Sequence, residues 1–391
     1  MQSFNFTEEQ ELLRKTIKEI AEENFKEKAK EIDKTHRFPR ENFELLAKLG
    51  MAGLILPEEY GGTGLDYVSY AMVIEEIAKA CATTSVILAA HLSLCSVPIA
   101  KFGSNVLKEK YLKRLASGEY LGAFCLSEPG NGSDAANMLT RAYDKGDHFI
   151  LNGTKAWITN GSEANVYLVI AQTNPELKHK GVCAFIVEKN MPGVSFGKLE
   201  DKLGIRGSAT CQVILDNVKV PKENLLGNIG EGFKIAMVTL DGGRIGISAQ
   251  ALGIAEASFE LASTYAKTRE AFGKKIINFQ AIQFMLVELA AQIEAGRLLT
   301  YEAANLHDLG QRFTRQSAEA KLFCSELASR AGNIAVQVLG GYGYTTEYDA
   351  ERYLRDAKIT EIYEGTSEIQ RIVISENIVK EVGAIHELPL H

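Results

Sequence analysis

The sequence IYEGTSE at 362–368 places one glutamate, Glu364, between an aromatic residue and a glycine. Structurally, this stretch predicts a helix stop at Gly365 and a new helix begun by a Ser367–Gln370 capping box. The same arrangement leaves Glu364 on a tight connection close to a helix N-terminus. Burial there would raise the pKa of its carboxyl group and suit it to act as a general base. The residues alone leave the catalytic role open.

An arginine that follows two glycines offers a second kind of chemistry, in Asp241-Gly242-Gly243-Arg244. Its forked guanidinium donors suit a phosphate, and the glycines let a ligand come close to the backbone. The alternative is an ordinary ion-paired or solvated arginine. We expect this sequence to open a long helix.

The sequence GNGSDA at 130–135 matches G-x-G-x-x-A, the pattern of a dinucleotide-binding turn. A Rossmann unit is not expected, because strand-like sequence follows and no acidic residue is suitably placed downstream. Two interpretations stay open: a turn of small residues, or a loop whose N–H and hydroxyl groups hold a phosphate or a flavin. The only tryptophan, Trp157, is interpreted either as a core residue or as a ring that stacks on a planar ligand.

Composition describes a folded protein that needs neither disulfide nor metal. The chain has 391 residues, 46% hydrophobic and 24% charged, enough for two or three domains. Its net charge of −7 argues against a general binder of nucleic acid or acidic membranes. Six cysteines and seven histidines are dispersed without the spacing of a metal or redox motif. We therefore expect no metal site and, from cysteines scattered in apolar sequence, a reducing compartment.

The N-terminal sequence MQSFNFTEEQELL lacks the regions of a signal peptide and is too acidic for a transit peptide. No run of about 18 uncharged apolar residues predicts a membrane span. We expect a cytoplasmic protein with no membrane segment and no nucleic-acid partner.

The elements that must position these residues fall into three parts. Residues 1–120 predict helices, with a Thr7–Gln10 capping box at the start and a very apolar stretch over 66–100. Residues 121–232 predict strands, and 233–391 predict helices again. We expect an α+β multidomain protein with these three ranges as an N-terminal all-α domain, a middle β domain and a C-terminal helical domain.

Within the middle part, Asn152-Gly153 between two strand-like runs predicts a hairpin turn. The further predicted strands are 166–171, 181–188 and 211–220. In the last part, the proline-free segment 280–325 predicts long helices.

Seven motifs in order along the chain resemble those of the acyl-CoA dehydrogenase family, most closely its short-chain, butyryl-CoA branch. They are AFCLSEPGNGSDA, NGTKAWITNG, EDKLGIRGS, LDGGRIGISAQALG, REAFGKKIINFQAIQF, QVLGGYGY and RDAKITEIYEGTSEIQR. The resemblance covers about residues 3–380, and the C-terminal GAIHELPLH has no counterpart. It implies the acyl-CoA dehydrogenase fold, with a C-terminal four-helix bundle.

The resemblance implies FAD as the cofactor. Residues that match the flavin loop and the opposite flavin wall are Phe124, Leu126, Ser127, Gly132, Ser133, Trp157, Ile158 and Thr159. Residues that match contacts to a neighbouring subunit's FAD are Arg269, Phe272, Gln280, Gln337, Gly340 and Gly341. Thr366 and Glu368 resemble the clamp on the ADP half.

The resemblance also implies an acyl-CoA substrate and a homotetramer. The matching substrate-binding residues are Ser133, Asp241, Arg244, Tyr363 and Gly365. Glu364 matches the base that removes the α-proton, giving a trans-2-enoyl-CoA, with electrons passed to an electron-transfer flavoprotein. The isovaleryl and long-chain branches carry their base where this chain has Gly243.

Three alternatives stay open. Two are flavoenzymes of the same fold, an acyl-CoA oxidase or an enoyl-CoA reductase. The third is a non-catalytic flavin-binding protein, against which Glu364 and the lack of a basic domain count. The segment 86–94, expected to line the acyl pocket, leaves linear four-carbon, branched and alicyclic acyl groups open.

Overall fold

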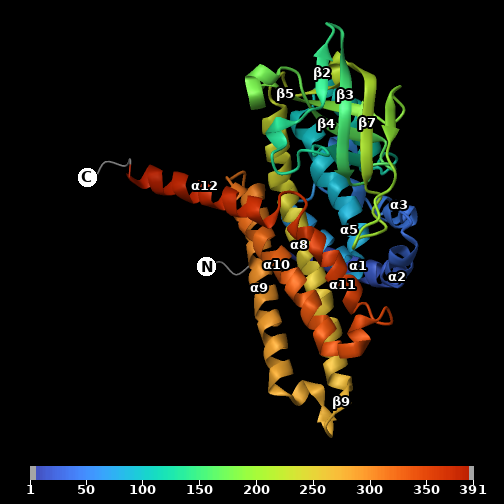
Figure 1. Cartoon of the computed structure of the whole chain (residues 1–391), viewed down its shortest axis with the longest axis vertical. Helices are drawn as coiled ribbons and strands as arrows, with labels where there is room; N and C mark the ends of the chain where they lie inside the picture. Colours follow the sequence, from blue (N-terminus) through green and yellow to red (C-terminus); the bar gives the residue numbers. More distant parts are fainter. Residues whose placement is uncertain (1–5, 387–391) are drawn as a thin grey trace. The chain divides into compact units, whose positions relative to one another are not determined.

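The computed structural model of the protein describes residues 6–386 and runs from helices through strands to helices (Figure 1). The predicted α+β architecture is thereby confirmed. Contacts divide the chain into two units: the first contains Tyr67–Ala82, the chain up to Ala21 and the chain from Arg244, and the second contains Glu22–Asp66 and Thr83–Gly243. The predicted domain boundaries near 120 and 232 stay a prediction. Expectations for the first five residues and the end of the C-terminal tail lie outside the described residues.

Helices form the N-terminal part. They are α1 (Glu8–Asn24), α2 (Lys26–Thr35), α3 (Arg40–Lys48), α4 (Tyr67–Ala80), α5 (Ala82–Ala89), α6 (Val97–Phe102) and α7 (Asn105–Ala116). The predicted capping box is confirmed at α1: Thr7 Oγ1 accepts from the Gln10 N–H, and Gln10 Oε1 accepts from the Thr7 N–H, each at 3.1 Å.

The apolar stretch predicted over 66–100 forms α4 and α5, a π-helix at Ala90–Ser96, and α6. Within the described residues, Ala82–Phe102 alone has the length and composition of a membrane-crossing helix. Within this segment, 78% of an apolar window of 18 residues is buried inside the protein. Its side chains Cys95 and Ile99 join the core that strands of the same unit form with Ile170 and Ile186. Burial of this extent is typical of a core helix.

Among the described residues, eight strands form one sheet in the second unit (Figure 1). They are β1 (Gly122–Cys125), β2 (Arg141–Asp144), β3 (His148–Ile158), β4 (Val166–Gln172), β5 (Val182–Glu188), β6 (Val194–Phe196), β7 (Cys211–Pro221) and β8 (Leu225–Leu226). The order is β6-β7-β3-β2-β4-β5-β8, with β1 parallel to β4. Every residue of β4 is buried, because β4 lies centrally and carries an unbroken apolar run.

Asn152 and Gly153 lie inside β3, so the predicted hairpin turn is wrong. The strand pairs with β7 on both sides of this point, and the register shifts between Leu151 and Gly153. Gly153 has φ 154°, and a Cβ there would meet Thr140 Oγ1 at 2.4 Å. The β-bulge and the close approach of Thr140 to the backbone therefore require a glycine at position 153. In the sequence alone, such an Asn-Gly pair cannot be distinguished from a hairpin turn.

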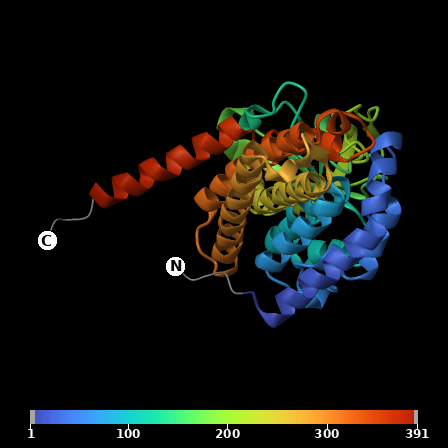
Figure 2. The ribbon, with the colours of Figure 1, turned by 90° about the horizontal axis from the view of Figure 1, so that it is seen from below.

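The C-terminal helices are α8 (Gly232–Thr268), α9 (Gln280–Asp308), α10 (Thr314–Leu339), α11 (Ala350–Lys358) and α12 (Ser367–His386). The long helices predicted over 280–325 are confirmed as α9 and α10. Both views show α12 extending away from α9 and α10 (Figures 1 and 2).

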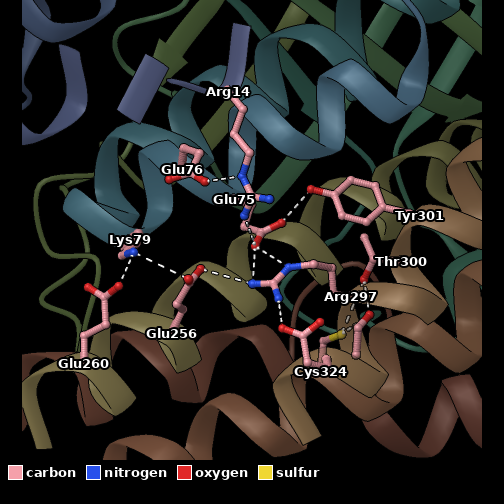
Figure 3. Close-up of polar contacts among 12 residues, drawn as sticks. Arg14, Glu75, Glu76, Lys79, Glu256, Glu260, Arg297, Thr300, Tyr301 and Cys324 are labelled. Atoms are coloured by element: carbon pink, nitrogen blue, oxygen red, sulfur yellow. Dashed lines mark hydrogen bonds and ion pairs between the residues drawn. The ribbon is translucent and has the colours of Figure 1, made fainter. Parts of the chain in front are cut away.

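A buried network of charges joins α1, α4, α8 and α9 within the first unit (Figure 3). The Glu75 side chain is only 1% exposed and accepts from Arg297 Nη2 at 3.0 Å and from the Tyr301 hydroxyl at 2.7 Å. Arg14 Nη2 lies 3.5 Å from Glu75, and Arg14 Nε donates to Glu76 at 2.6 Å. Burial raises the pKa of Glu75, and both arginines oppose this rise. Glu75 can carry a charge inside the protein only because these donors surround it.

Candidate functional site

The predicted base lies on a tight turn between a short 3-10 helix, η9 (Ile359–Glu361), and α12. Glu364 has φ 51° and Gly365 has φ 93°, so two consecutive residues are left-handed. For a residue with a side chain this conformation costs about 1–3 kcal/mol. Gln370 Nε2 donates to the carbonyl oxygens of Glu364 at 3.2 Å and Gly365 at 2.8 Å, and Lys321 Nζ donates to the Gly365 carbonyl at 2.6 Å. These donors hold the turn.

The surroundings of Glu364 suit its carboxyl group to proton transfer. Glu364 Oε2 is buried and has no hydrogen-bond partner among residues 6–386. Burial raises the pKa of Glu364 to about 8, while Lys321 and Arg244 act in the opposite direction. A carboxyl group with a pKa near the working pH can accept a proton and release it again. The structure thus brings Glu364 together with Arg244, as well as with Lys321.

Helix α12 is capped by Thr366, whose Oγ1 accepts from the Ile369 N–H at 3.3 Å. The predicted Ser367–Gln370 capping box is wrong, because Ser367 is already the first helical residue. Gln370 is therefore one position too far along to close such a box, and its amide instead contacts the carbonyls of the preceding turn. Thr366 is half-buried and Glu368 is exposed on the first turn.

The sequence Asp241-Gly242-Gly243-Arg244 lies inside α8, which already begins at Gly232. The prediction that it opens a helix is wrong, because both glycines continue an established helix. Asp241 is half-buried and Arg244 is 4% exposed.

The same helix anchors the residue before the predicted base. The half-buried Tyr363 donates its hydroxyl hydrogen bond to Gln250 Oε1 on α8. Burial raises the pKa of Tyr363 well above its usual value, so the phenol stays neutral. Tyr363 therefore ties the turn of Glu364 and Gly365 to α8.

The predicted flavin loop follows β1 in the second unit, and a buried ion pair shapes it. Lys155 Nζ donates to the Leu126 carbonyl and to Glu128 Oε1, both at 2.9 Å. The Glu128 carboxylate also accepts from two backbone N–H groups just before β2. The Ser127 carbonyl accepts from the Ala156 N–H at 2.9 Å. This network fixes the path of the loop beside β3, while Phe124 at its start is half-buried.

Trp157 is 63% exposed, so its interpretation as a core residue is wrong. It sits at a second register shift between β3 and β7, with φ 60°, between the buried Ala156 and Ile158. Thr159, next but one, is half-buried. A large ring held outward by a left-handed backbone is suited to stack on a planar ligand.

The C-terminal end of the predicted flavin loop is exposed. Gly132 and Ser133 are exposed, and a Cβ at Gly132 would meet nothing within 4 Å. A short 3-10 turn, Ala135–Asn137, and then β2 follow instead of a long helix. The G-x-G-x-x-A match is therefore not a Rossmann site.

A cavity of about 540 Å³ lies in the first unit at the end of α10. Arg269, Gly340 and Gly341 are among its lining residues. The Arg269 guanidinium lies 5.9 Å from the centre of the Tyr342 ring. The structure thus brings three of the predicted cofactor residues together around a concave surface with an exposed cation.

Three other predicted cofactor residues lie on the surface of the same unit. Phe272, 96% exposed, and Gly273 form the tip of the hairpin β9 (Glu270–Ala271) and β10 (Lys274–Lys275), both with positive φ. Gln280 begins α9 and Gln337 lies near the end of α10, and both are exposed.

Sequence reasoning missed three charged residues that hold the site: Glu128, Lys155 and Lys321. Each lies buried beside predicted site residues. The only sequence feature that could have indicated such a buried residue is a single charged residue next to apolar ones, as in KLFC at 321–324. That signal does not reveal the partner, which comes from a distant part of the chain.

The helix–sheet–helix architecture, with a glycine-containing loop after β1 that is not part of a Rossmann unit, narrows the class of protein, and comparisons with known proteins identify the family. The chain matches the family models "Acyl-CoA dehydrogenase, N-terminal domain" over residues 7–119, "middle domain" over 123–218 and "C-terminal domain" over 230–379. The chain belongs to the acyl-CoA dehydrogenase family. It is an acyl-CoA dehydrogenase, an oxidoreductase whose cofactor is FAD.

Three similar proteins illustrate the relationship. The mitochondrial short-chain specific acyl-CoA dehydrogenase of Rattus norvegicus is 49% identical over 379 residues, 97% of this chain and 92% of the relative. Butyryl-CoA dehydrogenase from Megasphaera elsdenii has a TM-score of 0.95 and 44% identity, covering 97% of this chain and 100% of its own. A chain solved in work on the electron transferring flavoprotein of Acidaminococcus fermentans and flavin-based electron bifurcation also has a TM-score of 0.95, with 49% identity over 96% of this chain and 99% of its own.

The residues described above fit FAD. The exposed ring of Trp157 offers a stacking surface for the isoalloxazine, and the open loop at Gly132 and Ser133 leaves room beside it. In the first unit, the arginine and glycines of the cavity match the needs of a pyrophosphate group. Both units therefore carry surfaces with the chemistry that this cofactor requires.

Removal of FAD is expected to increase the fluorescence of the single tryptophan, because a flavin stacked on an indole quenches its emission. Trp157→Phe keeps an aromatic ring and should abolish the signal while retaining much of the FAD. The measurement is emission of holoenzyme and apoenzyme, with flavin absorbance as a readout of occupancy. Emission that is the same with and without FAD would place Trp157 away from the flavin.

Proposed function

We propose that the protein oxidises short-chain acyl-CoA thioesters to trans-2-enoyl-CoA, with Glu364 as the general base and an electron-transfer flavoprotein as the electron acceptor. The observation that carries the proposal is the Glu364 carboxyl group, with its buried Oε2 and raised pKa, on a turn held by Lys321 and Gln370. The similarity to short-chain and butyryl-CoA dehydrogenases supports the chain length. The similarity to a chain from the electron transferring flavoprotein work supports the acceptor.

Glu364 removes the α-proton of the thioester in this proposal. Its Oε2 atom, which accepts no hydrogen bond from residues 6–386, is available for that proton. FAD, when bound, accepts the hydrogen that leaves the β-carbon as hydride. Gly243 supplies no carboxylate at the position of the alternative base, so Glu364 acts alone in this role. A base positioned in this way contributes roughly 10²–10⁴-fold to the rate.

The remaining site residues bind ligands in the proposal. The cofactor residues are Phe124, Leu126, Ser127, Gly132, Ser133, Trp157, Ile158, Thr159, Thr366 and Glu368. Ser133, Asp241 and Arg244 hold the CoA thioester, together with Tyr363 and Gly365 beside the base. Lys155 and Glu128 contribute indirectly, because their ion pair fixes the Leu126 carbonyl.

We also propose a homotetramer in the cytoplasm. The group that serves a neighbouring subunit's FAD consists of Arg269, Phe272, Gln280, Gln337, Gly340 and Gly341. The 96% exposure of Phe272 supports this, because a large apolar side chain so exposed is typical of an interaction surface. All six cysteines are buried and free, which is typical of a reducing compartment.

A chain-length series tests the proposed reaction: butyryl-, isobutyryl-, cyclohexanecarbonyl- and octanoyl-CoA, with anaerobic flavin reduction as the readout. Butyryl-CoA should give the highest kcat/KM. The kcat/KM for octanoyl-CoA should be at least about tenfold lower than that for butyryl-CoA. Each methylene that does not fit the acyl pocket costs about 1–3 kcal/mol. Reoxidation by an electron-transfer flavoprotein should be much faster than by oxygen. Preference for octanoyl-CoA would overturn the short-chain assignment.

The same experiment separates the alternatives. Rapid reoxidation by oxygen would indicate an acyl-CoA oxidase. Faster oxidation of the reduced flavin by crotonyl-CoA than reduction of the oxidised flavin by butyryl-CoA would indicate an enoyl-CoA reductase. A flavin that no acyl-CoA reduces would indicate a non-catalytic flavin-binding protein.

A further inference from the structure

The turn that carries Glu364 rests on a lysine with no exposed surface. The Lys321 side chain, on α10, is 0% exposed, and its Nζ donates to the Gly365 carbonyl at 2.6 Å. One turn further along α10, Ser325 Oγ donates to the Thr360 carbonyl at 2.8 Å. The same face of α10 therefore holds both ends of the connection from η9 to α12.

A hydrogen bond to a carbonyl does not require a charge. Gln370 already contacts the Gly365 carbonyl through a neutral amide at 2.8 Å, and a second neutral donor would suffice to hold the turn. Burying an ammonium group is costly unless an opposite charge compensates it. The use of a lysine at this place therefore points to an electrostatic role.

Charged groups face this lysine from each element around it. Glu364 lies on the turn, Glu361 on η9 and Glu368 on α12, and all three raise the pKa of Lys321. Burial and Arg244 on α8 lower that pKa, to about 8 in balance. Glu364 in turn is influenced by Lys321 and Arg244, while the neighbouring Tyr363 stays neutral. Lys321 and Glu364 thus form a buried pair in which each favours the charged form of the other.

We propose that Lys321 is a positioning residue that fixes the Glu364–Gly365 turn and, through its positive charge, favours the ionised form of Glu364, which can accept the α-proton. This inference rests on the proposed function of Glu364. The ammonium group contacts the peptide carbonyl beside the base, so one side chain both holds the backbone and supplies the charge. Without that charge, burial would favour the protonated carboxyl group, which cannot act as a base, more strongly and up to a higher pH.

The test compares Lys321→Gln, Lys321→Met and Lys321→Arg in the FAD-loaded enzyme. The protonation of Glu364 is followed against pH by infrared difference spectroscopy of its carboxyl stretch, assigned by its loss in Glu364→Gln. Both neutral variants should raise the titration midpoint of Glu364 by at least about one pH unit, whereas Lys321→Arg, which keeps a positive charge, should not raise it. The acid limb of flavin reduction by butyryl-CoA should move by the same amount. At a pH one unit below the wild-type midpoint, the neutral variants should therefore react about tenfold more slowly.

Gln370→Met is the matched control, because it removes a neutral donor from the same carbonyl. It should leave the Glu364 midpoint unchanged. Lys321→Gln keeps an uncharged donor at the site, so it tests the charge even where Lys321→Met fails to fold. A wild-type midpoint in the neutral variants, or an equal shift in Gln370→Met, would overturn the proposal. Because the infrared titration requires no turnover, a failure of the proposed reaction is recognised separately, by wild-type enzyme that butyryl-CoA does not reduce.

Discussion

Glu364→Gln should slow the reduction of the flavin by butyryl-CoA by roughly 10²–10⁴-fold or more. Glutamine keeps the volume and the polar shape of the side chain but cannot accept a proton. The loss should appear in kcat, because the base acts in the transition state and contributes little to binding. Anaerobic stopped-flow absorbance of the flavin measures the rate. FAD content and product binding should remain, since Trp157 and Arg244 are unchanged.

The wild-type pH profile gives the same prediction an independent readout. Because burial raises the pKa of Glu364 to about 8, the reactive carboxylate becomes more abundant as the pH rises toward that value. The rate of flavin reduction should therefore increase with pH and level off above about 8. The residual activity of Glu364→Gln should not show this increase in rate with pH.

Two further variants show whether position 364 itself matters. Glu326→Gln, with an exposed carboxylate paired to Arg371, makes the same chemical change on α10 and should react at the wild-type rate. Gly243→Glu combined with Glu364→Gly moves the base to the position used in other branches of the family and should restore some activity. A Glu364→Gln enzyme that reacts at close to the wild-type rate with every accepted acyl-CoA would show that another group is the base.

The regular elements could be predicted because their patterns are local. The Thr7–Gln10 box, the apolar run of β4 and the long helices over 280–325 each depend on residues close together in sequence. The motifs that carry the family resemblance are likewise contiguous. This is why the architecture and the candidate base could be inferred before any contact was known.

What could not be predicted depends on distant partners or on backbone geometry. The Asn152-Gly153 pair has the composition of a turn, but pairing with β7 and the close approach of Thr140 make it a bulge. The outward position of Trp157 follows from its left-handed backbone at a second irregularity.

The role of Lys321 is of the same kind. It needs the carbonyl of Gly365, 44 residues away, which no local pattern reveals. Long-range contacts and exceptional backbone conformations thus concentrate at the candidate site, where local rules are expected to fail.

Arg297→Met should destabilise the protein by about 3–5 kcal/mol at neutral pH, because it leaves the buried Glu75 with one fewer positive partner. The charge network of Figure 3 supplies the reason: Arg297 donates to Glu75 through both Nε and Nη2, and Glu75 is 1% exposed. The folded-state pKa of Glu75 is already raised, and losing Arg297 raises it further. A raised carboxyl pKa means that stability is lost as the pH rises through it, so the deficit should shrink in mildly acidic buffer. Urea unfolding at neutral and at mildly acidic pH measures the loss of stability, provided that wild type and variant have the same m value.

Arg37→Met is the matched control, since Arg37 pairs with Glu31 and Glu41 but is 38% exposed. Water solvates these carboxylates when the arginine is removed, so the loss of stability should be much smaller and nearly independent of pH. Arg297→Lys keeps a positive charge near Glu75 but cannot donate through two fixed N–H groups. Its loss of stability should therefore lie between those of Arg297→Met and Arg37→Met. Equal losses in Arg297→Met and Arg37→Met would mean that burial of Glu75 does not govern the energy of the network. A deficit in Arg297→Met that grows in acid would reverse the sign expected from a raised Glu75 pKa and assign the effect to lost packing of the arginine side chain.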